Sequence, residues 1–578
     1  MIDIDICQLA TSSSEILAQE RPVDIFKRAA KLRRMDVLRE HLESSWSLYL
    51  TNTGGQLEFQ ELLPLLVCGP SIFFITFPLN RNLDEFYTVQ YQYANGSEKT
   101  YQSPSTMMDE ILQTLATIAA LDCTGPQHEI DLKPKVFFIG TYKDQLPESS
   151  ANEIIKEIDK KLQKKIKETS LYHQGSIQFA NGTKQLIFTV NNLDESDQDF
   201  QIIRSALQQT IERSKEFTVK CPSNWLIFSL ILRAKHMSSQ VLSYNQCFAI
   251  AQKCGILDWT ELNNALFFIH TRLGLVRYFC AKDLNTLVVT DPQILFDTVT
   301  RLIMDTFTND HVAVNEIERF QERGIFSMKT VERISKKSQS NAQLPLKWLL
   351  GLLNHLRIAA FFTDEGDQRC FFPSVLCHAP IPEHIKCTKF PIEVPSLLVA
   401  FRNGFCPRGI PGALITYLMT NEMKSQISWE LNPSQVFKNQ VSFEVGSCDI
   451  MLTIHPTHLE VNVDPEPDVT SEVEARNTCG ETFIQLQKAL KDVTIGYREC
   501  DYFFTFYCTK PTCKDCLHPA EIDWDSKRLK CKLTIRHRHC KLPDHYDLWI
   551  PEENHPSQQG IDHCHAVASY SVILFLMQ

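Results

Sequence analysis

Short polar motifs follow three apolar runs of this chain. They are Asn52–Gln56 (NTGGQ), Thr141–Asp144 (TYKD) and Asn191–Asn192 (NN). The apolar runs are typical of buried strands, and parallel strands place their carboxyl ends at one edge of a sheet, where ligands bind. The three motifs therefore predict a polar pocket at such an edge.

The first motif resembles the Asp-x-x-Gly-Gln turn of Ras-like GTPases. By this resemblance Asn52 takes the place of the aspartate that holds Mg²⁺, and Gly55 takes the place of the glycine that senses the γ-phosphate. Gln56 would orient the attacking water, which makes it the candidate catalytic residue. Asn52 departs from the motif, and a neutral amide attracts Mg²⁺ less than a carboxylate does.

The other two motifs resemble the parts of a Ras-like pocket that recognise guanine. Thr141 stands where Asn-Lys-x-Asp begins, a replacement that is frequent in Roc domains, and Asp144 would accept hydrogen bonds from the guanine ring. Asn191 falls in the third, weaker motif. Each piece alone is more often a turn or a helix cap, but three pieces in this order, each at a strand end, favour a guanine-nucleotide pocket.

The loop that would bind the phosphates is missing from this sequence. It contains no G-x-x-x-x-G-K-S/T run, whose backbone N–H groups cradle the phosphates and whose Ser or Thr serves Mg²⁺. In small GTPases that loop lies about 45 residues before the Gly-Gly turn, which falls here near Met1. We therefore expect either a truncated chain with the loop upstream or a pseudo-GTPase. In both cases strong binding of GTP, GDP or Mg²⁺ by this chain is not expected.

Longer stretches resemble the Roco family, in which a Ras-like Roc domain precedes a COR region. The stretches are Asn52–Phe77, Ala251–Ile256, Ala265–Leu275, Val288–Asp297, Gly324–Ser327 and Phe371–Cys377. The resemblance implies a partial Roc domain at 1–217, a first COR half at 218–385, a second COR half at 386–560 and an atypical tail at 561–578. The second COR half is the main dimerisation device of the family, so the resemblance also implies a homodimer with signalling partners.

The apolar patterns predict a multidomain α/β protein. Strands are expected at 47–51, 71–77, 135–139 and 186–190, and helices at 107–121, 152–169 and 200–211. This alternation is typical of a doubly wound sheet, here a partial Ras-like one with an insertion around 80–103.

A helical part and a β-rich part are expected to follow the doubly wound sheet. Helices at 225–237, 244–254 and 259–273, followed by a strand pair at 274–279 and 286–290, indicate a winged-helix-like unit. Its helices lack a dense basic face, which favours protein contact over nucleic acid. Alternating strands at 441–445, 449–455 and 459–463 and a helix at 482–493 indicate the β-rich part.

Cysteine and histidine residues gather near the C-terminus. Cys508, Cys513, Cys516 and His518 have the order C-x4-C-x2-C-x-H, and Cys531 and Cys540 follow. Two close pairs of such ligands are the usual way to hold a tetrahedral zinc ion, and Cys531 or Cys540 would complete the set with Cys508 or His518. The alternative is a group of reduced cysteines in a β-rich core beside a solvated basic stretch.

Composition narrows the class of protein. Of the 578 residues, 43% are hydrophobic and 22% are charged, as in folded proteins, and the net charge of −11 disfavours a nucleic-acid or polybasic membrane role. No apolar run reaches the roughly 20 residues that span a bilayer, and the N-terminus lacks a basic start, so we expect a cytoplasmic chain. The hydrolase motifs G-x-S-x-G and H-E-x-x-H are absent from the sequence.

The sequence thus favours a Roc-COR signalling scaffold. The alternative is an active GTPase that converts GTP to GDP with Gln56.

Overall fold

The fold is taken from a computed structural model of the chain, which describes residues 71–549 apart from internal gaps. The gaps of five or more residues are 93–97, 122–132, 170–176, 214–220, 300–319, 338–343, 377–393, 420–429, 466–471, 495–499, 509–518 and 531–539. The architecture is mixed α/β, with one parallel sheet and several antiparallel sheets.

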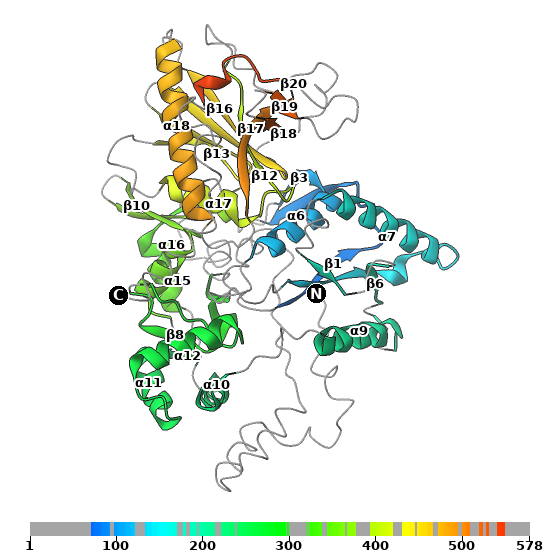
Figure 1. The fold of residues 1–578 in the computed structure, drawn as a ribbon, viewed down its shortest axis with the longest axis vertical. Coiled ribbons are helices and arrows are strands. Elements are labelled where there is room, and N and C mark those ends of the chain that lie inside the picture. The colour runs from blue at the N-terminus through cyan, green and yellow to red at the C-terminus, as the bar shows by residue number, and fades with distance from the viewer. Residues whose placement is uncertain are drawn as a thin grey trace.

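A parallel sheet organises the first part of the described chain, residues 72–213, which we call the α/β unit (Figure 1). Its long strands are β1 (Ile72–Pro78) and β4 (Lys135–Thr141), which run side by side. The short strands β5 (Gln178–Phe179) and β6 (Ile187–Thr189) also pair with β4 in parallel. All seven residues of β4 are buried, because the strand lies inside the sheet and is covered on both faces.

Helices cover both faces of this sheet. On one face α6 (Met107–Ala120) and α7 (Ala151–Glu168) pack in one cluster with Val136 and Phe138 of β4. On the other face α9 (Asp199–Arg213) packs with the alternate residues Phe137 and Ile139. Successive side chains of a strand point to opposite faces, so the two groups of helices lie on opposite faces of the parallel sheet.

The expected insertion in this unit is an antiparallel hairpin. Strands β2 (Phe86–Gln92) and β3 (Glu98–Thr106) pair with each other, and α6 begins directly after them. Thr106 caps α6 by accepting from the Asp109 N–H, while the Asp109 side chain accepts from the Thr106 N–H. The hairpin therefore ends where the helix N-terminus is fixed.

A helical unit follows, residues 223–289, with α10 (Ser223–His236), α11 (Tyr244–Lys253) and α12 (Trp259–Thr271) where helices were predicted. The predicted strand pair is wrong in one member. Strand β8 (Leu287–Val289) pairs with β7 (Val241–Ser243), and the expected strand at 274–279 makes only an isolated bridge through Arg277. Gly274 turns the chain with φ +62°, and the Arg277 guanidinium donates to the carbonyl groups of Gly274 and Val276, so no ladder extends along this segment.

A small three-stranded sheet connects the helical unit to the rest. Its strands are β10 (Ala360–Asp364), β11 (Asp367–Phe371) and β9 (Ile325–Ser327), in that order and all antiparallel. Helices α15 (Met328–Lys337) and α16 (Leu346–His355) flank it. Trp348 of α16 is buried and donates its indole N–H to the Leu284 carbonyl, which joins this part to the helical unit.

The last part, residues 397–549, which we call the β-rich unit, contains a nine-stranded antiparallel sheet in the order β13-β14-β15-β16-β12-β17-β18-β19-β20. The strands are β12 (Leu397–Phe401), β13 (Glu430–Phe437), β14 (Gln440–Val445), β15 (Cys448–Ile454), β16 (His458–Pro465), β17 (Tyr502–Tyr507), β18 (Pro519–Asp523), β19 (Arg528–Lys530) and β20 (Cys540–Lys541). Helices α17 (Gly409–Met419) and α18 (Glu472–Val493) share one core cluster with it. The three strands predicted here are confirmed.

Helix α18 begins ten residues before the predicted start at Thr482. Ala475 and Cys479 are fully buried and lie four residues apart, so they extend the apolar stripe that continues at Phe483 and Leu486. Their small side chains give a weaker apolar signal than the larger residues that follow.

None of the helices in the described part of the chain combines the length and the apolar character needed to cross a membrane.

Candidate functional site

The second and third predicted motifs lie side by side at the carboxyl edge of the parallel sheet. Strands β4 and β6 are neighbours, with Gly140 in register with Thr189, and the Val190 N–H donates to the Gly140 carbonyl oxygen at 2.9 Å. Thr141, the last residue of β4, and Asn191, two residues beyond the end of β6, therefore lie at the same edge of the sheet. The first motif, with Asn52, Gly55 and Gln56, lies outside the described residues.

Lys143 connects the two motifs through an ion-paired network. Its Nζ atom lies 2.6 Å from Oδ2 of Asp199 and 3.4 Å from Oδ1 of Asp197. Asp199 also accepts from the Thr189 hydroxyl at 2.6 Å, and Asp197 accepts from the Asn191 N–H at 2.8 Å. The second motif is thus held against the segment after β6.

These contacts shift the ionisation of both partners. Burial acts to lower the pKa of Lys143, but Asp199 and then Asp197 outweigh it and raise that pKa above its ordinary value. Burial acts to raise the pKa of Asp197, but the N–H groups of Asn191 and Asp199 and the charge of Lys143 lower it below its ordinary value. Both shifts favour the charged forms, so the ion pair is present across neutral pH.

Two other residues of the predicted guanine-recognition motifs, Asp144 and Thr141, differ in their exposure to solvent. Asp144 is exposed in the short 3₁₀ helix Lys143–Gln145. The Thr141 side chain is buried and its hydroxyl donates to the Phe77 carbonyl, so it joins β4 to β1. Between them Tyr142 has φ 57° and is 50% exposed. A left-handed conformation costs a residue with a β-carbon about 1–2 kcal/mol, and such strain is frequent at binding edges.

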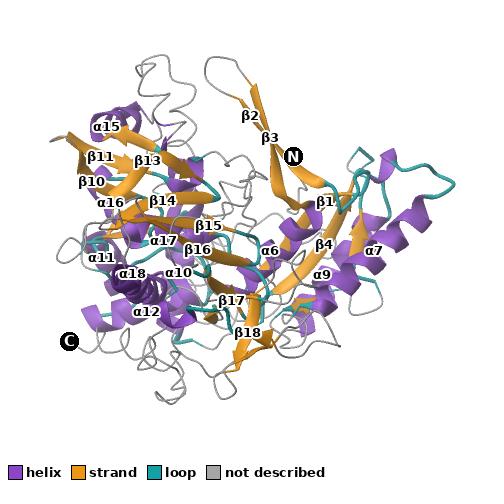
Figure 2. Cartoon of the chain, turned by 90° about the horizontal axis from the view of Figure 1, so that it is seen from above, coloured by secondary structure: helices purple, strands orange, loops and turns teal. Residues whose placement is uncertain are grey.

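Helix α6 joins the α/β unit to the β-rich unit. The Gln113 amide donates to the Cys406 carbonyl at 3.0 Å, and the Arg408 N–H donates to the Thr117 hydroxyl at 3.0 Å. The Arg408 guanidinium also pairs with the Glu110 carboxylate. Figures 1 and 2 both place α6 between the two sheets, which explains why eleven of its fourteen residues are buried.

The expected zinc cluster is only partly within the described residues. Cys508, directly after β17, and Cys540 of β20 are both buried, and their Sγ atoms lie 3.1 Å apart. The other expected ligands, Cys513, Cys516, His518 and Cys531, lie outside the described residues. The structure therefore brings Cys508 together with Cys540, one of the two partners that the spacing allowed.

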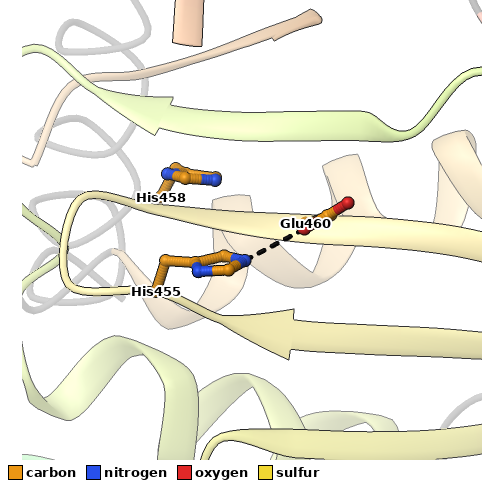
Figure 3. A group of neighbouring side chains, drawn as sticks. All are labelled: His455, His458 and Glu460. Atoms are coloured by element: carbon orange, nitrogen blue, oxygen red, sulfur yellow. Dashed lines mark hydrogen bonds and ion pairs between the residues drawn. The ribbon is translucent and has the colours of Figure 1, made fainter. Parts of the chain in front are cut away.

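A second cluster of possible metal ligands was not expected from the sequence. His455, His458 and Glu460 each offer one ligand atom, and these atoms lie within 4.8 Å of one another (Figure 3). Glu460 accepts from the Tyr507 hydroxyl at 2.8 Å and interacts with His455 Nε2 at 3.0 Å. Burial acts to raise the pKa of Glu460, but these two hydrogen bonds outweigh it and lower that pKa to about 2. The carboxylate is therefore ionised at neutral pH.

Comparisons with known proteins give similarities to solved structures only. No protein-family model matches the sequence, and no curated protein matches it. Among solved structures, the chain is similar to the RocCORdC part of Roco2 from Methanosarcina barkeri bound to GDP, with a TM-score of 0.31 and 13% identity. That match covers 54% of this chain and 96% of the other. A TM-score of this size does not define a shared fold.

Proposed function

We propose that this chain is a Roc-COR-type cytoplasmic scaffold whose nucleotide site is degenerate, and that it acts by forming a homodimer and binding signalling proteins. In this proposal residues 1–217 form a partial Roc-like domain, and 218–385 and 386–560 form the two COR-like halves. The sequence stretches that resemble Roco proteins support the assignment, and the second half would carry the dimer contact.

The main observation in favour of a degenerate nucleotide site is the acidic character of the carboxyl edge of the parallel sheet. Residues 191–199 contain Asp194, Glu195, Asp197 and Asp199 but no lysine or arginine. Lys143, which reaches this segment from the neighbouring motif, is neutralised by two of these carboxylates. The nucleotide is an anion, so excess negative charge on the edge that carries the guanine motifs weakens its attraction. The donors and positive charge that a triphosphate needs are not supplied by any G-x-x-x-x-G-K-S/T run in this sequence.

The rigid connection of α6 supports the scaffold part of the proposal. Glu110, Gln113 and Thr117 all contact the β-rich unit, and the connecting ion pair is nearly closed to solvent. An α/β unit that is built into a larger interface in this way is suited to present a fixed surface to partners.

Two measurements test the proposal on the full chain. Isothermal titration with GTP and with GDP in Mg²⁺ is expected to give no saturable binding at micromolar nucleotide. Light scattering over a range of protein concentrations is expected to give a dimer. Tight GTP binding would overturn the degenerate site, and a monomer at every concentration would overturn the COR-type assembly.

A second candidate function is an active GTPase. The adjacency of Thr141–Asp144 and Asn191 at one sheet edge favours it, because guanine-specific sites draw on both segments. The active GTPase is distinguished from the scaffold by GTP turnover that is lost in the Asp144→Ala and Gln56→Ala variants. No turnover by the unmodified chain would leave the scaffold function.

A further inference from the structure

Four nitrogen and oxygen atoms that could bind a metal ion lie close together in the β-rich unit, and they come from three segments of its chain. His455 follows β15, and His458 and Glu460 lie on β16 (Figure 3). Tyr507 ends β17. Along the chain of contacts, His455 Nε2 to Glu460 Oε2 is 3.0 Å, Glu460 Oε2 to Tyr507 Oη is 2.8 Å, and Tyr507 Oη to His458 Nε2 is 2.9 Å. On the intervening strand β12, Ala400 is in register with His458 and Leu398 is in register with Glu460.

These separations are close to those of ligands around one metal ion. Zinc binds nitrogen and oxygen at about 2.0–2.2 Å, so neighbouring ligands in a tetrahedron are about 3.3 Å apart. Two imidazoles and one carboxylate form a ligand set that zinc uses in proteins, with a fourth position for water or another donor. The Tyr507 hydroxyl contacts both Glu460 and His458 and so lies beside that fourth position.

We propose that His455, His458 and Glu460 form a binding site for a divalent transition-metal ion, with zinc as the preferred ion and Tyr507 beside the open position. All three ligands come from the β15–β16 turn and the start of β16. Neither the predicted nucleotide pocket nor the expected cysteine cluster includes these residues.

The neighbouring side chains hold two of the ligands in place. Asn462 donates to the Glu460 carboxylate at 3.3 Å, and the Ser396 hydroxyl in turn contacts Asn462 at 2.5 Å. The Thr457 hydroxyl lies 2.8 Å from Nδ1 of His458. Partners of this kind orient metal ligands and fix the histidine tautomer.

His455 provides the movable ligand and the route of entry. Its ring stacks on His458 with centroids 4.4 Å apart and an interplanar angle of 17°, so one ring must turn before both nitrogens face the same ion. The His455 side chain is 32% exposed, whereas His458 is 2% exposed. His455 is therefore the ring with room to turn.

When the ion binds, the N–H proton of each histidine needs a place other than Nε2. A neutral imidazole carries one N–H, and the ion needs the lone pair of Nε2. His458 can carry its proton on Nδ1 and donate it to the Thr457 hydroxyl, which accepts as well as donates. His455, whose side chain is 32% exposed, can carry its proton on Nδ1. No proton has to be lost from either histidine.

Cobalt titration of the full chain after chelator treatment tests the proposal. A site of nitrogen and oxygen ligands gives visible ligand-field bands without a near-ultraviolet thiolate-to-cobalt band. We expect about one equivalent of such a site, displaced by zinc, and a higher Tm with the metal bound. His455→Ala and Glu460→Gln are expected to weaken binding at least about tenfold. Glu481→Gln, an exposed carboxylate-to-amide change on α18, is the matched control.

The variants also separate this site from the cysteines. Glu460→Gln keeps the shape of the side chain, so loss of cobalt binding with an unchanged circular dichroism spectrum would report on the ligand. In Cys508→Ser/Cys540→Ser, the nitrogen and oxygen bands are expected to persist. Absence of these bands in the unmodified chain, or bands that survive in both His455→Ala and Glu460→Gln, would overturn the proposal.

Discussion

Arg408 of the β-rich unit and Glu110 of α6 form an ion pair with side chains only 8% and 13% exposed. Removing one partner of a buried pair leaves the other charge uncompensated, at a cost of about 3–5 kcal/mol. We therefore expect Arg408→Ala to lower the free energy of unfolding by an amount in this range, measured by urea unfolding. The double variant Arg408→Met/Glu110→Gln is expected to lose less.

The chain contains a matched exposed pair as a control. Lys161 of α7 pairs with Asp84, with side chains 35% and 56% exposed. Exposed pairs contribute about 0–1 kcal/mol, so Lys161→Ala is expected to change the free energy of unfolding by less than about 1 kcal/mol. Equal losses for Arg408→Ala and Lys161→Ala would show that the α6 pair does not hold the two units together.

The Lys143–Asp197 contact predicts an acid-dependent loss of stability. The pKa of Asp197 is depressed in the folded chain, so its contribution is present above the unfolded value of about 3.9 and is lost as pH falls through the folded pKa. The stability difference between the unmodified chain and Asp197→Asn is therefore expected to be constant from about pH 5 to 8 and to shrink below about pH 4.

Urea unfolding at a series of pH values measures this difference. A Lys143→Met background removes one of the causes of the depressed pKa, so the same comparison there is expected to vary less with pH. A difference that grows as pH falls would contradict the assigned sign.

Close packing at the carboxyl end of β4 makes Gly140 intolerant of a side chain. A β-carbon there would lie 2.6 Å from Cδ2 and 2.7 Å from Cγ of Leu79, which is 2% exposed. Overpacking of this kind costs about 1–3 kcal/mol. Gly140→Ala is therefore expected to destabilise the chain, and Gly140→Ala/Leu79→Ala is expected to lose less than the sum of the two single changes.

A double-mutant cycle by urea unfolding checks the coupling between these positions. Gly480→Ala on α18 is the control, because a β-carbon added there would meet no atom within 4 Å, and alanine in a helix is favoured by up to about 1 kcal/mol. Simple additivity of Gly140→Ala and Leu79→Ala would rule out the steric explanation.

The sequence predicts the elements whose apolar pattern is strong. Strands β1 and β4 are nearly continuous apolar runs, and α7 shows an apolar stripe, so each lies within a residue or two of its predicted range. The β2–β3 hairpin was not predicted as strands, because β3 reads EKTYQSPST, which is largely polar and contains a proline. Strand β7 has only three residues, too few to show a period.

The candidate sites are less predictable because they depend on register between distant segments. Lys143 and Asp199 lie 56 residues apart and meet only because β4 and β6 are neighbours in the sheet. The acidic residues directly after β6 were the available signal. Tyr507 meets Glu460 across 47 residues and one intervening strand, β12, so spacing alone gives no sign of that contact.

The buried thiols Cys508 and Cys540 predict a thiolate zinc site distinct from the histidine cluster. Their Sγ atoms are 3.1 Å apart, whereas two sulfur ligands at about 2.3 Å from zinc are about 3.8 Å apart, so the two thiols would have to separate slightly to bind one ion. Chain purified without chelator is expected to contain thiolate-bound zinc, and Cys508→Ser/Cys540→Ser is expected to lose about one equivalent by elemental analysis. Cys280→Ser, which changes an exposed cysteine, is the control. Zinc bound at His455, His458 and Glu460 is expected to remain in the Cys508→Ser/Cys540→Ser variant. The thiolate-to-cobalt charge-transfer band of the unmodified chain is the measurement that assigns the lost ion to sulfur. If that band is absent from the unmodified chain, the two cysteines are reduced core residues.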